Sequence, residues 1–257
     1  MFRSLHIAAT GMVAQETKLD SIANNLANAN TVGFKRQTVA FEDLLYQNQR
    51  SQGGAAGGGA SVQLGSGARV VATTRAFSQG AIQQTGNPLD LAIEGPGFLP
   101  VTRGDGSTAY SRAGALTLDA TGQIVTTDGL PVQPQLSVPS NATSVVVGAD
   151  GTVSAEVPGQ SAPVVVGKMA LAIFPNPNGL TAAGHNLFLA TEASGEASAG
   201  DPGTEGRGTL MQGAVESSNV EVVTEMIDLV RTQRAYEINS KVIQAADEML
   251  RNATQAR

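Results

Sequence analysis

Apolar residues near the start of the chain recur at alternating spacings of three and four, from Leu5 to Ala29. This is the a/d repeat of a heptad helix, and it predicts a helix over residues 4–30. Ser4 is the expected N-cap, and the Asn- and Gly-rich stretch 28–33 is the expected end. The residues expected at the helical interface are Leu5, Met12, Leu19, Ile22 and Leu26.

A second heptad pattern occupies the other end of the chain and predicts a helix over residues 219–252. Ser218 and Glu221 have the spacing of a capping box, in which each side chain bonds a free amide at the helix start. The apolar positions recur every seven residues, with one additional d-type position. The expected interface residues are Val222, Met226, Leu229, Tyr236, Ile243 and Leu250.

The two predicted helices are the only elements able to cover each other's apolar seams. The fold class expected is therefore α+β, with N- and C-terminal helices pairing as a coiled coil around a mainly β central domain. Each helix also carries apolar residues outside its seam, so one partner helix is not enough to bury them and assembly with further chains is expected. These residues are Ile7, Val13, Ala23, Ile227, Val230 and Met249.

Short β-type runs separated by turn dipeptides fill residues 68–210. Asp-Gly pairs at 105, 128 and 150 are typical of hairpin turns, and frequent prolines limit central strands. The spacing favours a compact domain of hairpins over alternating β/α units. The strand candidates are Val70-Val71, 89–93, Tyr110, 116–118, Ile124-Val125 and 145–147.

Residues 47–67 are rich in glycine, with seven glycines between Gly53 and Gly67. Glycine loses more backbone entropy on folding than any other residue, so this segment is expected to be a flexible linker or to be ordered by neighbouring molecules. The expected domains are 1–45 (N-terminal helix and junction), 46–67 (Gly-rich extended segment), 68–210 (β-rich outer domain) and 211–257 (C-terminal helix).

Composition narrows the possible functions. The net charge of −6 disfavours nucleic acid or an anionic membrane surface as the main partner. The chain has no cysteine and only His6 and His185 as histidines, so we expect no metal site and no cofactor. No apolar run approaches the ~20 residues of a membrane span, and the N-terminus lacks an ordinary signal peptide. We therefore expect no membrane insertion, and either a cytoplasmic protein or one exported without cleavage.

The sequence offers little to a catalytic interpretation. A Ser-His-Asp hydrolase would need His6 or His185, but the chain contains no G-x-S-x-G motif. His185 lies beside glycine and asparagine, which suits a turn, and Glu94 has no second carboxylate nearby for glycosidase chemistry. We therefore expect no catalytic residues. A secreted β-domain enzyme with oligomerising helices stays an alternative that loss of turnover on mutating His185 would support.

Three stretches of the sequence resemble a known family. "ANNLANANTVGFKR" (residues 23–36), "QTGNPLDLAIEGPGF" (84–98) and the stretch from "QGAVESSNV" to "AADEML" (212–250) are similar to the flagellar rod and hook axial proteins. The ending of the first motif in "FEDLLYQ" and the Gly-rich stretch after it favour the distal rod subunit within that family. The alternatives are the hook subunit and a proximal rod subunit.

The resemblance implies a structural protein that polymerises helically into a rigid rod transmitting torque from motor to hook. It implies export through the flagellar type III apparatus without a cleaved signal peptide, and a rod that crosses the periplasm. Implied partners are further copies of the chain, other rod proteins, the hook protein and the rings around the rod. In such proteins the terminal helices form the inner layer and the β-domain the outer layer, and residues 46–67 would be the extended segment associated with stiffness.

Within the junction motif, we expect the asparagines to cap and hydrogen-bond the helix end, Gly33 to provide a tight turn, and Phe34 to anchor the following segment in an apolar pocket. Lys35-Arg36 is either a solvated pair or a contact with an acidic neighbour. Export also leads us to expect terminal helices that are disordered in the monomer and fold on assembly. The junction residues are Asn24, Asn25, Asn28, Gly33, Phe34, Lys35 and Arg36.

Overall fold

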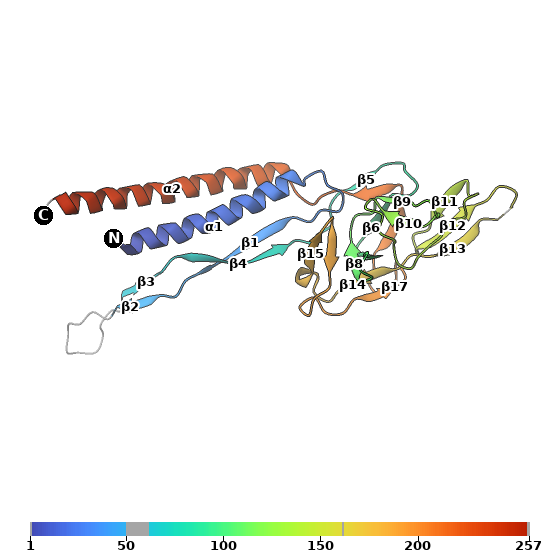
Figure 1. Cartoon of the computed structure of the whole chain (residues 1–257), viewed down its shortest axis with the longest axis horizontal. Helices are drawn as coiled ribbons and strands as arrows, with labels where there is room; N and C mark the ends of the chain where they lie inside the picture. The colour runs from blue at the N-terminus through green and yellow to red at the C-terminus, as the bar shows by residue number, and fades with distance from the viewer. Residues whose placement is uncertain (1, 50–61, 161, 256–257) are drawn as a thin grey trace. The chain divides into compact units, whose positions relative to one another are not determined.

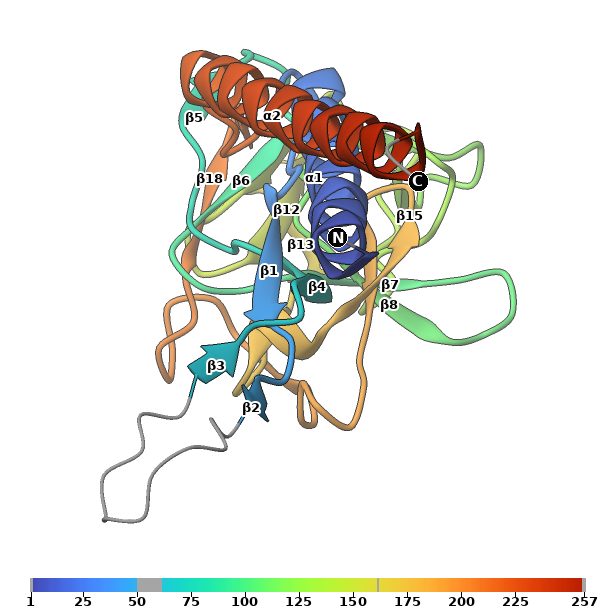
Figure 2. The same ribbon diagram turned by 90° about the vertical axis from the view of Figure 1, so that its left-hand side faces the viewer.

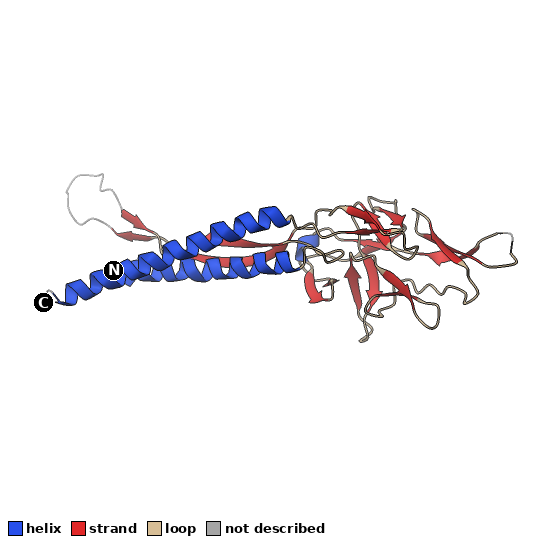
Figure 3. Cartoon of the chain, turned by 90° about the horizontal axis from the view of Figure 1, so that it is seen from above, coloured by secondary structure: helices blue, strands red, loops and turns tan. Residues whose placement is uncertain are grey.

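A computed structural model describes residues 2–49, 62–160 and 162–255. The chain divides into two compact units. One, here called the helical unit, comprises Met1–Ala27, Gln37–Arg75 and Glu221–Arg257. The other, the β unit, comprises Asn28–Arg36 and Ala76–Val220. Two long helices and a largely β central region confirm the predicted α+β class (Figure 3).

The first helix, α1, spans Phe2–Ala27. The apolar repeat predicted it correctly, but Ser4 is wrong as its N-cap because the helix already begins two residues earlier. After Ala27 the chain makes a turn in which the amide of Thr31 donates to the carbonyl of Asn28 at 3.1 Å. This local bond ends the helix at the polar stretch that the sequence indicated.

The second helix, α2, spans Val222–Gln255. The predicted capping box does not form. The hydroxyl of Ser218 instead accepts the amide of Val220 at 3.3 Å, two residues before the helix begins. The carboxylate of Glu221 accepts the hydroxyl of Thr224 at 2.9 Å. Glu225 provides an acidic group in the first turn, where the helix dipole favours negative charge.

A long antiparallel ribbon completes the helical unit. It pairs β1 (Gln37–Asp43) with β4 (Ala68–Arg75), and a shift of register falls between Ala40 and Phe41. Residues 68–75 therefore pair inside the helical unit, although the sequence analysis grouped them with the β-rich region. Further along, β2 (Gln47–Gln49) pairs with β3 (Val62–Leu64). The remainder of the glycine-rich stretch, 50–61, lies outside the described residues.

Within the helical unit, α1 lies between α2 and the ribbon (Figures 1 and 2). The guanidinium of Arg3 donates to the carbonyl of Leu64 at 2.6 Å, which fixes the start of α1 to the end of β3. Gly67, with a φ of +116°, lies so close to α1 that an added Cβ would be 2.2 Å from the hydroxyl of Thr10. One glycine of the glycine-rich stretch is thus required by close packing.

The β unit consists of small antiparallel sheets. One is the four-stranded sheet β15-β16-β8-β7 and another is the three-stranded sheet β11-β12-β13. The other strands form two-stranded pairs. Its strands are β5 (Ile82–Gln84), β6 (Leu91–Glu94), β7 (Leu99–Thr102), β8 (Thr108–Ser111), β9 (Leu116–Leu118), β10 (Ile124–Thr126), β11 (Ser144–Val147), β12 (Thr152–Glu156), β13 (Val164–Lys168), β14 (Leu171–Ile173), β15 (Thr181–Gly184), β16 (Leu187–Leu189), β17 (Ser198–Gly200), β18 (Thr209–Gln212) and β19 (Ala214–Glu216).

Aliphatic side chains from many of these strands form one core, which includes Ile93, Val101 and Val153. A second, aromatic cluster contains Phe98, Phe174 and Phe188, with Phe77 packed edge-on against Phe98 at 5.4 Å between ring centroids. Edge-to-face contacts of this kind suit the quadrupoles of aromatic rings. The aromatic cluster lies beside the junction motif described next.

Candidate junction site

The junction motif, residues 28–36, belongs to the β unit. Its turn depends on Gly33, which has a φ of +70°. The amide of Gly33 donates to the carbonyl of Glu216 at 2.8 Å. A Cβ at this position would be 2.6 Å from the amide nitrogen of Ala113. Both the backbone conformation and the lack of space therefore require glycine, as the sequence led us to expect for a tight turn.

Lys35, the next polar residue of the motif, is buried in a cluster of charges. Its ammonium donates to the carboxylate of Glu216 at 2.6 Å and to the carbonyl of Ser78 at 2.8 Å. The other carboxylate oxygen of Glu216 accepts Nε of Arg112. The amide of Gly80 donates to the same carboxylate oxygen as Lys35, at 2.8 Å. Lys35 therefore belongs to an ionic interaction inside its own chain.

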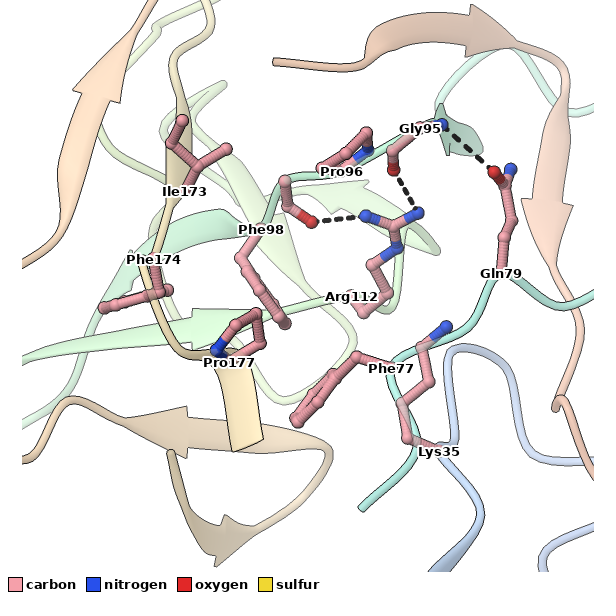
Figure 4. Close-up of a pocket in the computed structure, with 11 residues that line it drawn as sticks. Lys35, Phe77, Gln79, Gly95, Pro96, Phe98, Arg112, Ile173, Phe174 and Pro177 are labelled. Atoms are coloured by element: carbon pink, nitrogen blue, oxygen red, sulfur yellow. Dashed lines mark hydrogen bonds between the residues drawn. The ribbon is translucent and has the colours of Figure 1, made fainter. Parts of the chain in front are cut away.

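Arg112 connects the cluster to the loop after β6. Its guanidinium donates to the carbonyls of Gly97 and Gly95, the second at 2.7 Å (Figure 4). A cavity of about 290 Å³ lies beside it, with Phe77, Phe98 and Phe174 among its lining residues. The side chain of Gln79 accepts the amide of Gly95 at 3.1 Å and so holds the cavity's rim. These polar groups are engaged within the β unit, and the cavity wall is largely apolar.

Burial opposes the ionisation of Glu216, but Arg112 and Lys35 outweigh it, so the pKa of Glu216 lies below its ordinary value of 4.5. Burial lowers the pKa of Lys35 below its ordinary value of 10.5, and the hydrogen bond to Glu216 acts in the opposite direction. Glu216 is therefore ionised at neutral pH and is the anion around which Lys35 and Arg112 are arranged.

Asn25 lies in the helical unit, buried near the end of α1. Its side-chain oxygen accepts the amide of Gln37 at 2.8 Å, and its nitrogen donates to the carbonyl of the same residue at 2.8 Å. The nitrogen also donates to the carboxylate of Glu225 at 3.3 Å. The side-chain amide thus binds β1 and α2, rather than the end of its own helix as the sequence suggested.

The other motif residues occupy different environments. Asn24 is exposed on α1, and the side chain of Asn28 accepts the hydroxyl of Thr31 at 3.2 Å. Phe34 is buried, and its carbonyl accepts the amide of Asn219 at 3.4 Å. The amide of Arg36 donates to the side chain of Asn219 at 2.7 Å.

The expected interface residues of α1 are mostly turned inward. Ile22 is buried, and Leu5, Met12, Leu19 and Leu26 are half-buried. Off this seam, Ile7 and Val13 are exposed. In the single chain, α2 and the ribbon thus cover the apolar seam of α1 in part.

The apolar positions of α2 are placed differently. Leu229, Ile243 and Leu250 are half-buried, whereas the buried positions are Glu225, Thr232 and Ala246. Nine large apolar side chains of α2 are between 41% and 66% exposed. They are Val222, Val223, Met226, Ile227, Val230, Tyr236, Ile238, Val242 and Met249.

Sequence reasoning missed Glu216, Arg112 and Asn219. The only local signal was a single charge, Glu216, at the end of an otherwise apolar strand. Its partners are 104 and 181 residues away in the sequence. No short motif contains that pairing. His185, by contrast, lies exposed with a φ of 52° between β15 and β16, which confirms the turn expected there.

Comparison with known proteins identifies the class. Residues 5–35 match the family profile described as flagella basal body rod protein, and residues 211–256 match the C-terminal profile of the flagellar basal body rod FlgEFG proteins. Residues 92–155 match the D1 domain profile of the flagellar hook proteins FlgE/F/G. The three profiles together describe rod and hook proteins of the bacterial flagellum. Among the described residues, neither helix is both long and apolar enough to cross a membrane.

Full-length relatives narrow the class to one family. A flagellar basal-body rod protein FlgG of Caulobacter vibrioides is 45% identical over 99% of both chains. The FlgG of a Buchnera aphidicola strain is 44% identical over 99% of this chain and all of the relative, and that of Bacillus subtilis is 40% identical over 97% of each. The chain therefore belongs to the FlgG family of flagellar basal-body rod proteins. A rod protein FlgF of Caulobacter vibrioides is 32% identical over 99% of this chain.

Proposed function

We propose that this protein is a structural subunit of the distal rod of the bacterial flagellum. It polymerises helically into a rigid tube that passes torque from motor to hook. Membership of the FlgG family supports this assignment, and the higher identity to FlgG than to FlgF disfavours a sibling rod subunit. Its partners are other copies of the chain, neighbouring rod proteins, the hook protein, the surrounding rings and the export apparatus.

The observation that supports polymerisation most is the exposed apolar face of α2. Soluble monomers rarely expose large contiguous apolar surface, and a long surface helix normally covers its apolar side. Burying such side chains stabilises an interface by about 25 cal/mol per Å² of apolar area. We infer that the nine exposed side chains of α2 contact other copies in the polymer.

Packing of α1 on α2 supports a coiled-coil inner layer built from both ends of the chain. In this proposal the inner layer is formed by the helices α1 and α2, the outer layer by the β unit, and the extended segment 46–67 contacts neighbouring copies. A contact between unlike surfaces of successive copies gives an open helical polymer instead of a closed dimer. The narrow inner face of α2 is used within the chain, so its wide outer face is available for such contacts.

A single charge placed on that outer face tests the proposal. Ile238 is 61% exposed, so Ile238→Asp leaves the isolated chain folded but puts a carboxylate where an interface must be dry. We expect cells carrying this variant to lack rods beyond the proximal part and to be non-motile, as seen in electron micrographs of isolated basal bodies.

Gln244→Asp is the matched control, because Gln244 is an exposed polar residue of the same helix. It adds the same charge without replacing an apolar side chain, and we expect normal rods. Normal rods in the Ile238→Asp strain would show that this face of α2 does not contact other copies.

A further inference from the structure

The backbone passes between the two units four times, after Ala27, Arg36, Arg75 and Val220. Every force that one unit exerts on the other through the chain must travel along these connections. A connection that is free to rotate about its own φ and ψ angles transmits little bending or twisting force. What restrains the connecting segments inside the β unit therefore matters for a protein that transmits torque.

Three of the four connections meet at one side chain, that of Asn219. Its oxygen accepts the amide of Arg36 at 2.7 Å, and its nitrogen donates to the carbonyl of Ala76 at 2.8 Å. Its own backbone directly precedes Val220, the last residue before α2's connection. The amide of Ala76 also donates to the carbonyl of Arg36 at 2.8 Å, which closes the network.

We propose that Asn219 is a positioning residue that ties these three connecting segments into one bundle where they leave the β unit. An asparagine suits this task because one planar group supplies both an acceptor and two donors. The same nitrogen reaches the carbonyl and the hydroxyl of Ser78, both at 3.1 Å, so the bundle is also joined to the segment leading to β5. The inference rests on the proposed function, because only a torque-bearing subunit needs its connections to move as one.

The ionic cluster binds the same segments separately from Asn219. The carboxylate of Glu216 holds Lys35 and the amide of Gly80, and Lys35 also bonds Ser78. We therefore expect replacement of Asn219 to leave the β unit folded, while it frees the amide of Arg36 and the carbonyl of Ala76 from their bonds to Asn219. This separation makes the role of Asn219 measurable without unfolding the protein.

Hydrogen exchange on the full chain tests the bundle directly. Asn219→Leu keeps the approximate shape but removes all hydrogen bonds of the side chain, and Asn219→Asp keeps the acceptor but loses the donors. In Asn219→Leu we expect the amide of Arg36, which loses its acceptor, to exchange at least about tenfold faster. The amide of Ala76 keeps its bond to the carbonyl of Arg36, but we expect it to exchange faster as well, because the carbonyl of Ala76 no longer binds Asn219. In Asn219→Asp we expect faster exchange at Ala76.

Two comparisons make the result decisive. Val101 and Val153 lie in the aliphatic core, so their amides should exchange at wild-type rates in both variants. Asn178→Asp, at an exposed position of the same unit, should change none of these rates. Unchanged exchange at Arg36 and Ala76 would overturn the proposal. So would a uniform increase that includes the core, because Asn219 would then act in folding alone.

A second readout addresses the connection to torque. The chain has no cysteine, so two spin labels can be attached through Gln135→Cys in the β unit and Gln244→Cys in α2. Pulsed dipolar spectroscopy is made on assembled rods in which labelled chains are diluted among unlabelled ones, so that α2 is folded. It should give a broader distance distribution in Asn219→Leu than with Asn219 intact, and equal widths would contradict the proposal. Because hydrogen exchange uses the monomer, it stands apart from the polymerisation test, whose failure would remove only the link to torque.

Discussion

At the scale of single residues, Gly33 is fixed by two independent constraints, a left-handed backbone and a backbone neighbour at the place of a Cβ. Gly33→Ala therefore introduces strain of about 1–2 kcal/mol from the dihedral angles alone, and the clash with Ala113 adds to it. We expect the free energy of unfolding of the β unit to fall by more than that strain, as measured by urea denaturation.

Gly86→Ala separates the two constraints. Gly86 has a φ of +74°, close to that of Gly33, but an added Cβ would meet nothing within 4 Å. Gly86→Ala should therefore lower the free energy of unfolding only by the strain of the dihedral angles, about 1–2 kcal/mol. Equal losses at the two positions would show that the approach of Ala113 to Gly33 costs nothing, and that the turn is free to shift away.

Glu216 makes the β unit sensitive to acid. Because the folded pKa of Glu216 lies below 4.5, its contribution to stability is present above that value and is lost as the pH falls through the folded pKa. In Glu216→Gln we expect the free energy of unfolding to fall less than in the wild type as the pH is lowered from neutral to pH ~3. At neutral pH the variant should be less stable by about 3–5 kcal/mol, because Lys35 and Arg112 lose their buried partner.

Urea unfolding across that pH range measures both effects, and Glu196→Gln is the control, since Glu196 is exposed. A wild-type pH dependence in Glu216→Gln would mean that other carboxylates cause the acid sensitivity. The prediction concerns the β unit alone, in which all members of the cluster lie.

At the scale of elements, the two helices could be predicted because their signal is local. A repeat of 3.6 residues is visible in any window of the helix, wherever its partner lies. Val70-Val71 in β4 was a strand candidate, but its pairing with β1 was missed because the two strands are separated by residues 44–67 and neither alternates cleanly between buried and exposed positions. Strands that pair over such a separation produce no repeating pattern of residues in the sequence.

The strands of the β unit show the same limit. The Asp-Gly turns of β7–β8 and β11–β12 were predicted from the dipeptide alone, and β8 and β11 each contain a strand candidate, whereas β7 and β12 were not predicted. Pairs such as β6–β18 and β5–β19 join distant parts of the sequence, and of these four strands only β6 was predicted. The site follows this pattern, because Gly33 was predicted from its own neighbourhood while Glu216 and Asn219 act through distant partners.

At the scale of the whole molecule, the helical unit differs from the β unit in how it covers its apolar surface. The β unit has two cores, whereas α2 leaves its outer face exposed. Before assembly the helical unit should therefore open more often, in keeping with export of an unfolded chain.

Limited proteolysis of the purified monomer checks this expectation. We expect early cleavage within about 40 residues of each end and a resistant fragment that contains residues 76–220. Resistance of both ends equal to that of the β unit would contradict it. The Gln244→Asp variant should give the same fragments as the wild type, because its substitution lies outside any core.

An electron cryomicroscopy reconstruction of the assembled rod, at a resolution that shows side chains, tests the central claim most directly. We expect Val223, Met226 and Ile238 of each copy to be buried against other copies in a hollow helical polymer. A polymer in which these side chains face only solvent would contradict the claim that the outer face of α2 drives assembly.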